Sequence, residues 1–217
     1  MISRDKFYNH LRPFVRFYTD LKRKKIMKSE FEIRFREFQI VKGDVIIDLG
    51  ANRGDFTNLF SNFSCEIFAI EPSIEAFRYL VRRFRNSKNI SCMNFAVAKK
   101  LEMRKLFSHK FSVNDPLGYS IRASIIESKK NMDSLNFQKI VSIPISILLE
   151  SFEYIKLLKI DIEGAETEIW EDIKKNFEKI EYLLIEIHDS INPELRSEIN
   201  TFILHQGLDQ KWKTDWL

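Results

Sequence analysis

Short continuous apolar runs recur along the chain, and they constrain its fold more than any other feature. The runs cover residues 45–47, 65–70, 90–97, 155–160 and 182–187. Segments whose apolar residues have helical spacing lie between several of them, at 56–63, 73–84, 165–176 and 193–205. Because such runs are typical of strands buried on both faces, and strands that alternate with helices form parallel sheets, we predict an α/β fold. Its sheet is expected to be doubly wound and mostly parallel, with helices on both faces.

Residues 98–150 interrupt this alternation. Segments 101–107 and 141–147 indicate additional strands, and Pro144 predicts that the second lies at a sheet edge, because proline has no N–H to donate. The polar segment 108–136 between them has poor periodicity and is our candidate for a mobile segment over a site. The chain has 217 residues and shows no internal repeat or linker, so we predict a single domain over 1–217.

The positive charge of the chain is concentrated at its start. Residues 1–36 contain 11 Lys or Arg against 4 Asp or Glu, whereas the whole chain has a net charge of only +4. Aromatic residues interleave with these bases, partly at helical spacing, so we predict a basic helical extension over residues 1–40. Either this helix contacts an anionic membrane or polymer through residues 1–28, or it packs its aromatic face on the domain with its charges in solvent. We favour the second interpretation, because runs of basic residues are common on solvated faces.

Composition excludes several classes of protein. Apolar residues make up 44% of the chain and charged residues 30%, the balance of a globular domain with a core. No apolar run approaches the roughly 20 residues that span a bilayer, and the first residues lack the apolar centre of a secretory signal. Cys65 and Cys92 are too few for a disulfide framework or a cysteine zinc site. We therefore expect a cytoplasmic protein.

Two of the six glycines lie directly after the first predicted strand, in the segment DLGANRGD over residues 48–55. Parallel sheets bind ligands at the carboxyl ends of their strands, and a turn there needs glycine where a ligand approaches the backbone. The pattern is G-x-x-x-G at Gly50 and Gly54, which is neither the G-x-G-x-x-G of dinucleotide sites nor the G-x-x-x-x-G-K-[ST] of phosphate loops. The segment therefore predicts a ligand site of another kind.

An acidic residue ends each of the first two predicted strands. Asp48 follows the first and Glu71 follows the second. A carboxylate repels a pyrophosphate but suits a cationic ligand or one that offers N–H and O–H donors. An acid at the end of the second strand can accept both hydroxyl hydrogens of a ribose. Together with the glycine loop, these acids predict a nucleoside ligand that lacks phosphate.

These segments resemble the class I methyltransferases that bind S-adenosylmethionine. VIIDLGANRGDFT over 45–57 resembles their first motif, and IFAIEPS over 67–73 resembles their ribose-binding acid motif. KIDIEGAE over 159–166 resembles the K-I-D-x-E-G-x-E signature of the FkbM-type methyltransferases, and YLLIEIH over 182–188 resembles the strand that follows it. The resemblance implies an S-adenosylmethionine-dependent enzyme with a Rossmann-like, seven-strand-type sheet and a catalytic core over 41–217. It also implies methyl transfer, usually to a hydroxyl oxygen.

The resemblance assigns a cofactor site residue by residue. Four residues of the first motif are expected to line the methionine and ribose side: Asp48, Gly50, Asn52 and Gly54. Glu71 is expected to take the ribose hydroxyls, and Asn94 and Ala96 are expected near the adenine. After residue 205 only a short tail remains, so the closing antiparallel strands of the family are expected to be shortened, which would leave an open sheet edge.

The candidates for catalysis lie at the ends of the later predicted strands. Methyl transfer to a hydroxyl needs a base that removes the proton. We select Asp161, Glu163 and His188, with Glu186 and Asp189 as further candidates. His188 is the best base by its intrinsic pKa, although its place fits the orientation of a carboxylate or the cap of a helix nearly as well. A divalent ion on Asp161, His188 and Asp189 is an alternative, but magnesium prefers oxygen ligands, so we predict no metal.

Three functions remain open. We favour an O-methyltransferase that acts on a glycan, a lipid-linked sugar or another secondary metabolite. The second is a nucleic-acid methyltransferase, suggested by the basic extension, but the motif of amino-group methylation is absent because the chain has no Pro-Pro pair. The third is a non-catalytic module that docks on a membrane through residues 1–28. The expected partner is therefore a small-molecule or glycan hydroxyl acceptor, with nucleic acid less favoured.

Overall fold

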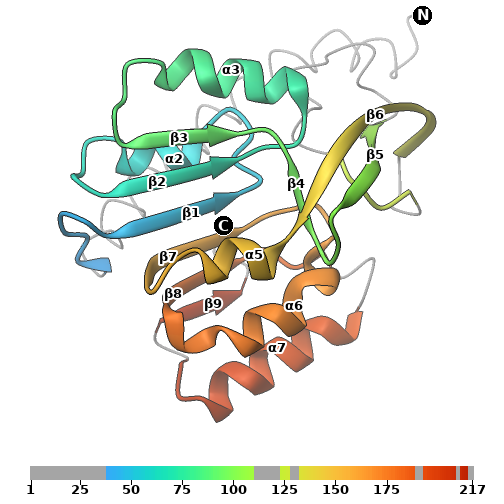
Figure 1. Ribbon diagram of the computed structural model, residues 1–217. Coiled ribbons are helices and arrows are strands. Elements are labelled where there is room, and N and C mark those ends of the chain that lie inside the picture. The colour runs from blue at the N-terminus through green and yellow to red at the C-terminus, as the bar shows by residue number, and fades with distance from the viewer. Residues whose placement is uncertain (1–37, 110–122, 128–131, 189–192, 209–210, 215–217) are drawn as a thin grey trace, which may run out of the picture. The chain divides into compact units, whose positions relative to one another are not determined.

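The main sheet has six strands, and every pair of neighbours in it is parallel. The computed structural model describes residues 38–109, 123–127, 132–188, 193–208 and 211–214, so nearly all of the predicted basic extension lies outside the described residues. Within the unit 40–216, the strand order is β3-β2-β1-β7-β8-β9 (Figure 1). The strands are β1 (Val45–Leu49), β2 (Glu66–Ile70), β3 (Ile90–Met93), β7 (Ile155–Ile160), β8 (Ile180–Ile185) and β9 (Trp212–Thr214). The predicted α/β fold with a mostly parallel sheet is confirmed.

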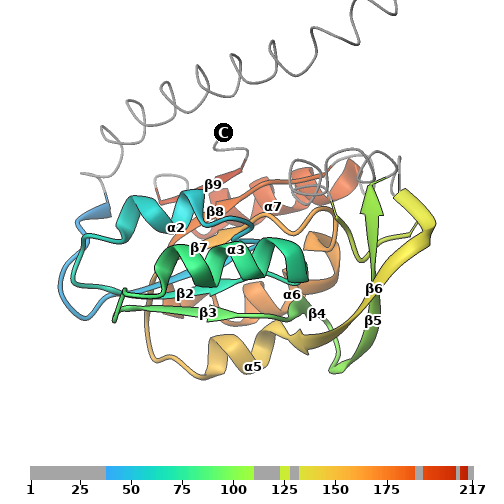
Figure 2. The same cartoon turned by 90° about the horizontal axis from the view of Figure 1, so that it is seen from above.

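Helices cover both faces of this sheet (Figure 2). They are α2 (Asp55–Phe60), α3 (Ile74–Phe84), α5 (Ile145–Glu150), α6 (Glu166–Lys175) and α7 (Pro193–His205). Buried side chains of α5, α6 and α7 pack with Ile47 on one face. Leu80 and Phe84 of α3 pack with Ala69 on the other face. From β1 the strand order runs outward to β2 and β3 on one side, and from β7 it runs outward to β8 and β9 on the other. Open parallel sheets bind ligands at the point where the strand order changes direction in this way.

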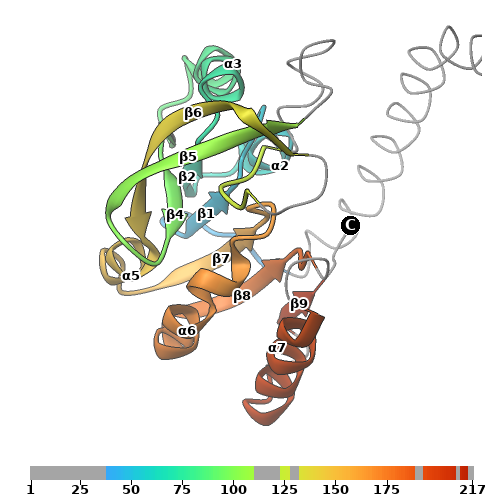
Figure 3. The same cartoon turned by 90° about the vertical axis from the view of Figure 1, so that its right-hand side faces the viewer.

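A second sheet of three strands occupies the region where the alternation breaks. Its order is β4-β6-β5, with β4 (Ala96–Ala98) parallel and β5 (Glu102–His109) antiparallel to β6 (Met132–Pro144). Figure 3 shows β5 and β6 as a long bent pair beside the main sheet. The single strand predicted over 90–97 is therefore two strands, β3 and β4, in two different sheets.

Two expectations for this region are wrong. β6 lies between β4 and β5 rather than at an edge, and the strand predicted over 141–147 ends at Pro144. A proline is tolerated there because it is the last residue of its strand, where a missing N–H no longer interrupts the ladder. Residues 145–150 form α5 instead, with Ile145, Leu148 and Leu149 buried. A short apolar run fits a helix as well as a strand, and the helical spacing of these three residues decides between them.

The main sheet closes with a short strand. β9 has three residues and pairs in parallel with β8, so the closing element is shortened as expected, but it is not antiparallel. Among the described residues the main sheet has six strands, one fewer than the seven-strand-type sheet that the resemblance implied. In the part of the chain that the structure describes, no helix has the length and apolar character needed to cross a membrane.

Gly54 lies where two helices meet. It precedes α2 with a φ of +76°, a left-handed conformation that favours glycine. A Cβ atom on Gly54 would lie 2.4 Å from the Phe84 ring and 2.6 Å from Cδ1 of Leu80, both on α3. Gly54 does not line the pocket described below. Its position thus serves helix packing, and the ligand contact that the resemblance implied stays a prediction.

A buried lysine joins the two central strands. The ammonium of Lys159 on β7 lies 3.1 Å from Oδ1 of Asp48 on β1. It donates hydrogen bonds of 3.2 and 2.9 Å to the carbonyl oxygens of Leu49 and Gly50. Burial disfavours the charge of Lys159, but the nearby carboxylates of Asp48 and Asp161 outweigh burial and raise its pKa. Lys159 is therefore a cation that fixes the end of β1.

Asp48 lies beneath the glycine loop, whereas we expected it to line a ligand site. Its side chain is completely buried, and the hydroxyl of Thr57 donates a hydrogen bond of 2.7 Å to Oδ2. With Lys159 beside its other oxygen, both ends of the carboxylate face protein groups. Asp48 consequently supports the glycine loop from beneath and does not line the pocket.

Substituting Gly54 separates backbone strain from helix packing. Gly207 has a φ of +66° and nothing within 4 Å of its Cβ position, so Gly207→Ala is the matched control. We expect Gly207→Ala to lower the free energy of unfolding by about 1–2 kcal/mol, the strain of a left-handed residue. Gly54→Ala should lower it by about 1–3 kcal/mol more, because α3 must move. Equal losses in urea denaturation would contradict this account of Gly54.

Removing the charge of Lys159 tests the central ion pair. Lys159→Met leaves Asp48 buried without its cation, so we expect unfolding to become easier by about 3–5 kcal/mol. The double variant Lys159→Met with Asp48→Asn should recover part of this loss. Lys175 pairs with Asp172 at 3.2 Å but its side chain is 70% exposed, so Lys175→Met should lower stability by less than about 1 kcal/mol. Similar denaturation midpoints for Lys159→Met and Lys175→Met would rule out a central role for Lys159.

Candidate active site

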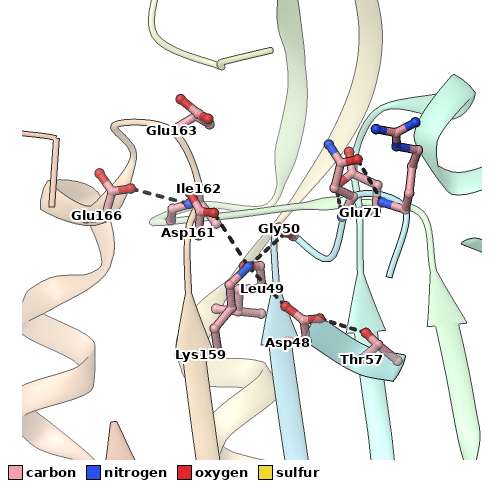
Figure 4. Close-up of polar contacts among 12 residues, drawn as sticks. Asp48, Leu49, Gly50, Thr57, Glu71, Lys159, Asp161, Ile162, Glu163 and Glu166 are labelled. Carbon is pink, nitrogen blue, oxygen red and sulfur yellow. Dashed lines mark hydrogen bonds and ion pairs between the residues drawn. The ribbon is translucent and has the colours of Figure 1, made fainter. Parts of the chain in front are cut away.

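A pocket opens at the carboxyl ends of β1, β2 and β7, beside the second sheet. Six of the ten residues selected from the sequence line it: Gly50, Asn52, Glu71, Ala96, Asp161 and Glu163. Apolar side chains complete the wall, among them Phe95, Val97, Leu106 and Ile125. The structure thus brings together residues from four separate segments of the chain, which Figure 4 shows in part. Their roles toward a ligand remain predictions.

The glycine loop approaches the end of β7 too closely for a side chain. Gly50 has a φ of +74°, and a Cβ atom there would lie 1.8 Å from the backbone oxygen of Asp161. The N–H groups of Gly50 and Ala51 donate hydrogen bonds of 3.0 and 2.9 Å to the carbonyl oxygen of Ile70. The loop is therefore bound to β2 on one side and to β7 on the other, which fixes its course along the pocket.

Glu71 is a buried carboxylate at the end of β2. Its Oε2 accepts a hydrogen bond of 2.8 Å from the N–H of Asn52, and its Oε1 accepts one of 2.8 Å from the N–H of Ser73. Burial raises the pKa of Glu71 to about 7, although these two hydrogen bonds act in the opposite direction. Each carboxylate oxygen has a second lone pair. Glu71 can therefore accept one further hydrogen bond on each oxygen, as two adjacent hydroxyl groups would require.

Asn94, predicted to lie near an adenine, binds the backbone that carries Glu71. Its side-chain amide donates hydrogen bonds of 2.8 and 3.0 Å to the carbonyl oxygens of Glu71 and Pro72. Asn94 does not line the pocket, whereas Ala96 two residues later does. Asn94 therefore holds the turn that carries Glu71, which makes it a support of the site.

The turn after β7 carries two acidic residues to the pocket. Glu163 has a φ of +57°, which costs a residue with a side chain about 1–2 kcal/mol, and Gly164 follows with a φ of +108°. Glu166 is almost completely buried and accepts the N–H groups of Ile162 at 3.3 Å and Gly164 at 3.1 Å. Glu166 therefore does more than its place in the first turn of α6 suggests. It closes the turn in which Asp161 and Glu163 lie.

His188 lies between two carboxylates and outside the pocket wall. Its Nδ1 is 3.1 Å from Oε1 of Glu166, and its Nε2 is 3.3 Å from Oε2 of Glu163. Burial lowers the pKa of His188, but the hydrogen bonds to Glu163 and Glu166 outweigh it and raise the pKa to about 10. An imidazolium has no lone pair with which to take a proton. This geometry does not support the prediction that His188 is the general base.

Asp161 lines the pocket directly after the end of β7. Burial raises its pKa above the usual range, although Lys159 at 3.7 Å acts in the opposite direction. Burial also raises the pKa of Glu186 at the end of β8. Ligand atoms of Asp161, Glu186 and His188 lie within 4.8 Å of one another, but a metal there would first have to displace Glu163 or Glu166 from His188. We assign no metal to this cluster, and Asp189 lies outside the described residues.

Three carboxylates and no cationic side chain line the pocket among the described residues: Glu71, Asp161 and Glu163. A negative pocket with apolar walls suits a ligand that combines a positive charge, sugar hydroxyls and a flat apolar ring. The residues present therefore fit the sulfonium, ribose and adenine of S-adenosylmethionine.

Two contributions to the site were not predicted from the sequence. One is Lys159, although it stands in the signature segment, and the other is the wall formed by Ala123 and Ile125, inside a segment predicted only as a cover. Residues 110–122 and 128–131 of that segment lie outside the described residues.

Comparisons with known proteins identify the family. The methyltransferase FkbM domain matches residues 48–208, and no curated protein matches the chain. Three solved structures are similar: an FkbM methyltransferase from Methylobacillus flagellatus, an rRNA methylase from Streptococcus thermophilus and a precorrin-6y C5,15-methyltransferase from Geobacter metallireducens. Their identities are 14%, 11% and 10%, and their TM-scores are 0.46, 0.44 and 0.43. The matches cover 76%, 75% and 81% of this chain and 38%, 73% and 68% of the other chains.

The first of these matches extends over only 38% of the FkbM structure, so this chain corresponds to part of that protein. The family assignment rests on the domain match over 48–208 and not on these structural matches. The FkbM methyltransferases use S-adenosylmethionine as the methyl donor. The chain belongs to the FkbM methyltransferase family.

Proposed function

We propose that the chain transfers a methyl group from S-adenosylmethionine to a hydroxyl group of a glycan, a lipid-linked sugar or another small metabolite. The observation that carries this proposal is the pocket lined by Glu71, Asp161 and Glu163 at the carboxyl edge of the sheet. When bound, S-adenosylmethionine supplies an electrophilic methyl group on a sulfonium sulfur. The chain's own residues must hold the donor, orient the acceptor and remove the acceptor's proton.

Residues from three strand ends would hold the donor. Glu71 accepts the two ribose hydroxyls on its remaining lone pairs, while Asn52 and Ser73 keep its oxygens in place. The adenine packs between apolar wall residues near Ala96. The methionine end lies along the Gly50 loop, whose course is fixed by its close approach to the backbone oxygen of Asp161.

Asp161 would act as the general base. It lines the pocket at the end of β7, and burial raises its pKa, so it holds a proton more readily than an exposed aspartate does. A sugar hydroxyl is a weak nucleophile, and a carboxylate positioned within hydrogen-bond distance takes its proton as the oxygen attacks the methyl carbon. Glu163 lies on the same wall and adds negative charge beside the cationic donor.

A label-transfer experiment tests the reaction class. The full chain is incubated with S-adenosylmethionine that carries a tritiated methyl group, and with separate pools of oligosaccharides, lipid-linked sugars and total RNA. We expect label in a saccharide pool as a base-stable methyl ether, and a loss of at least about 100-fold in Asp161→Asn, since general bases contribute roughly that much or more. Label in RNA alone, or label in no pool although the donor binds, would contradict the proposed acceptor class.

Glu71→Gln tests the ribose contact. Hydrogen bonds to a charged group contribute about 1.5–3 kcal/mol, so we expect the variant to bind S-adenosylmethionine roughly 10- to 100-fold more weakly in calorimetry. A glutamine cannot accept from both Asn52 and Ser73, so stability should also fall by about 1–3 kcal/mol, and circular dichroism checks that the variant is folded before binding is measured. Wild-type affinity should weaken as the pH falls through about 7, where Glu71 becomes protonated, and Glu71→Gln should lack this dependence. Glu153 is exposed, so Glu153→Gln is the control, and equal affinities for both variants would refute the assignment.

A further inference from the structure

His188 connects the end of β8 with the turn after β7, and it does so through both ring nitrogens. Nε2 faces the carboxylate of Glu163, which lines the pocket, and Nδ1 faces the carboxylate of Glu166, which is almost completely buried. The two acids stand on either side of Gly164 in the chain. One imidazole therefore bridges the pocket wall and the buried acid that closes the turn.

The turn held in this way is in an unfavourable conformation. Glu163 adopts a left-handed backbone at φ +57°, which residues with side chains rarely adopt. Glu166 binds the backbone of the turn through the N–H groups of Ile162 and Gly164. Such a conformation persists where surrounding contacts impose it, and such sites cluster at functional positions. The contact from His188 to Glu163 reaches the strained residue itself.

We propose that His188 is a positioning residue, whose imidazolium holds the Glu163 carboxylate at the pocket wall and thereby presets the acidic turn that carries Asp161. This inference rests on the proposed function for its consequence, the binding of a cationic methyl donor. It assigns His188 no contact with the donor or acceptor. The charge of His188 acts through Glu163 and Glu166.

The groups that face His188 determine its charge. Glu163 lies in the turn and Glu166 at the start of α6, and both form hydrogen bonds with His188. Asp161 and Glu186, which follow β7 and β8, interact electrostatically with His188. All four are acids, and they favour the protonated ring. Because the pKa of His188 is higher in the folded chain than its ordinary value of 6.5, its stabilising contribution is complete below about pH 6.5 and is lost as the pH rises through about 10.

A proton NMR titration of the wild-type chain tests the charge of His188 without any ligand. The resonance of His188 is assigned by its absence in His188→Gln, and exposed His205 is the reference. We expect His188 to remain protonated from pH 6 to pH 9. In Glu163→Gln, the titration of His188 should move to lower pH. A His188 that titrates near pH 6.5 in the wild type would overturn the proposal.

Binding of S-adenosylmethionine then tests the positioning role. We expect His188→Gln and Glu163→Gln each to weaken binding by about tenfold, and the double variant to bind no more weakly than Glu163→Gln, because both changes remove one linked contact. His188→Lys keeps a positive charge and should recover part of the loss, whereas His205→Gln should bind like the wild type. Additive losses in the double variant, or no loss in His188→Gln, would contradict the role. If the wild type binds no donor, the proposed function fails. The titration alone then decides whether a protonated His188 holds Glu163 and Glu166.

Discussion

The buried ammonium of Lys159 is the interaction on which the site depends. It lies between β1 and β7, the two central strands, and binds the carbonyl oxygens of Leu49 and Gly50 as well as the carboxylate of Asp48. The carbonyl oxygen of Leu49 also accepts the N–H of Asp161 at 3.1 Å, whereas the carbonyl oxygen of Gly50, beyond the end of β1, needs another donor. Lys159 supplies that donor, and Gly50 can therefore turn within van der Waals reach of β7. The pocket forms where this turn leaves the sheet.

The same arrangement explains why the pocket is acidic. Lys159 and His188 both lie behind the wall, and each holds acids from the protein side: Lys159 faces Asp48 and Asp161, and His188 faces Glu163 and Glu166. No cationic side chain reaches the pocket surface among the described lining residues. Carboxylates with cations on one side can remain charged in a buried place and still present negative potential on the other side. Such a surface suits a sulfonium and disfavours a phosphate.

Most of the main sheet could be predicted from the sequence, because strands buried on both faces need continuous apolar runs. The run over 155–160 is β7 and the helix over 193–205 is α7, each with the predicted bounds. The second sheet was harder, since short apolar runs do not distinguish strand from helix and the run at 145–147 became part of α5. The apolar run over residues 90–97 also does not indicate that the chain leaves the main sheet after β3 and enters the second sheet as β4.

The sequence was enough to predict which strand ends carry the acids of the site. It was not enough to predict which side chains pair with one another. Glu71, Asp161 and Glu163 lie where the motifs placed them, because the carboxyl ends of neighbouring parallel strands share one edge. Asp48 and His188 were given ligand or base roles because the sequence does not reveal their partners. Lys159 is 111 residues from Asp48 in the chain, and His188 is 22 residues from Glu166. Contacts of this kind follow from the fold.

A crystal structure of the full chain with S-adenosylhomocysteine, the demethylated product, would show whether the strand-end carboxylates hold the donor. We expect both ribose hydroxyls to lie within about 3.2 Å of the two carboxylate oxygens of Glu71, a normal hydrogen-bond distance. The sulfur should face Asp161, and the methionine end should lie along the Gly50 loop. A ligand bound elsewhere, or a ribose turned away from Glu71, would contradict the claim that these strand-end carboxylates form the donor site.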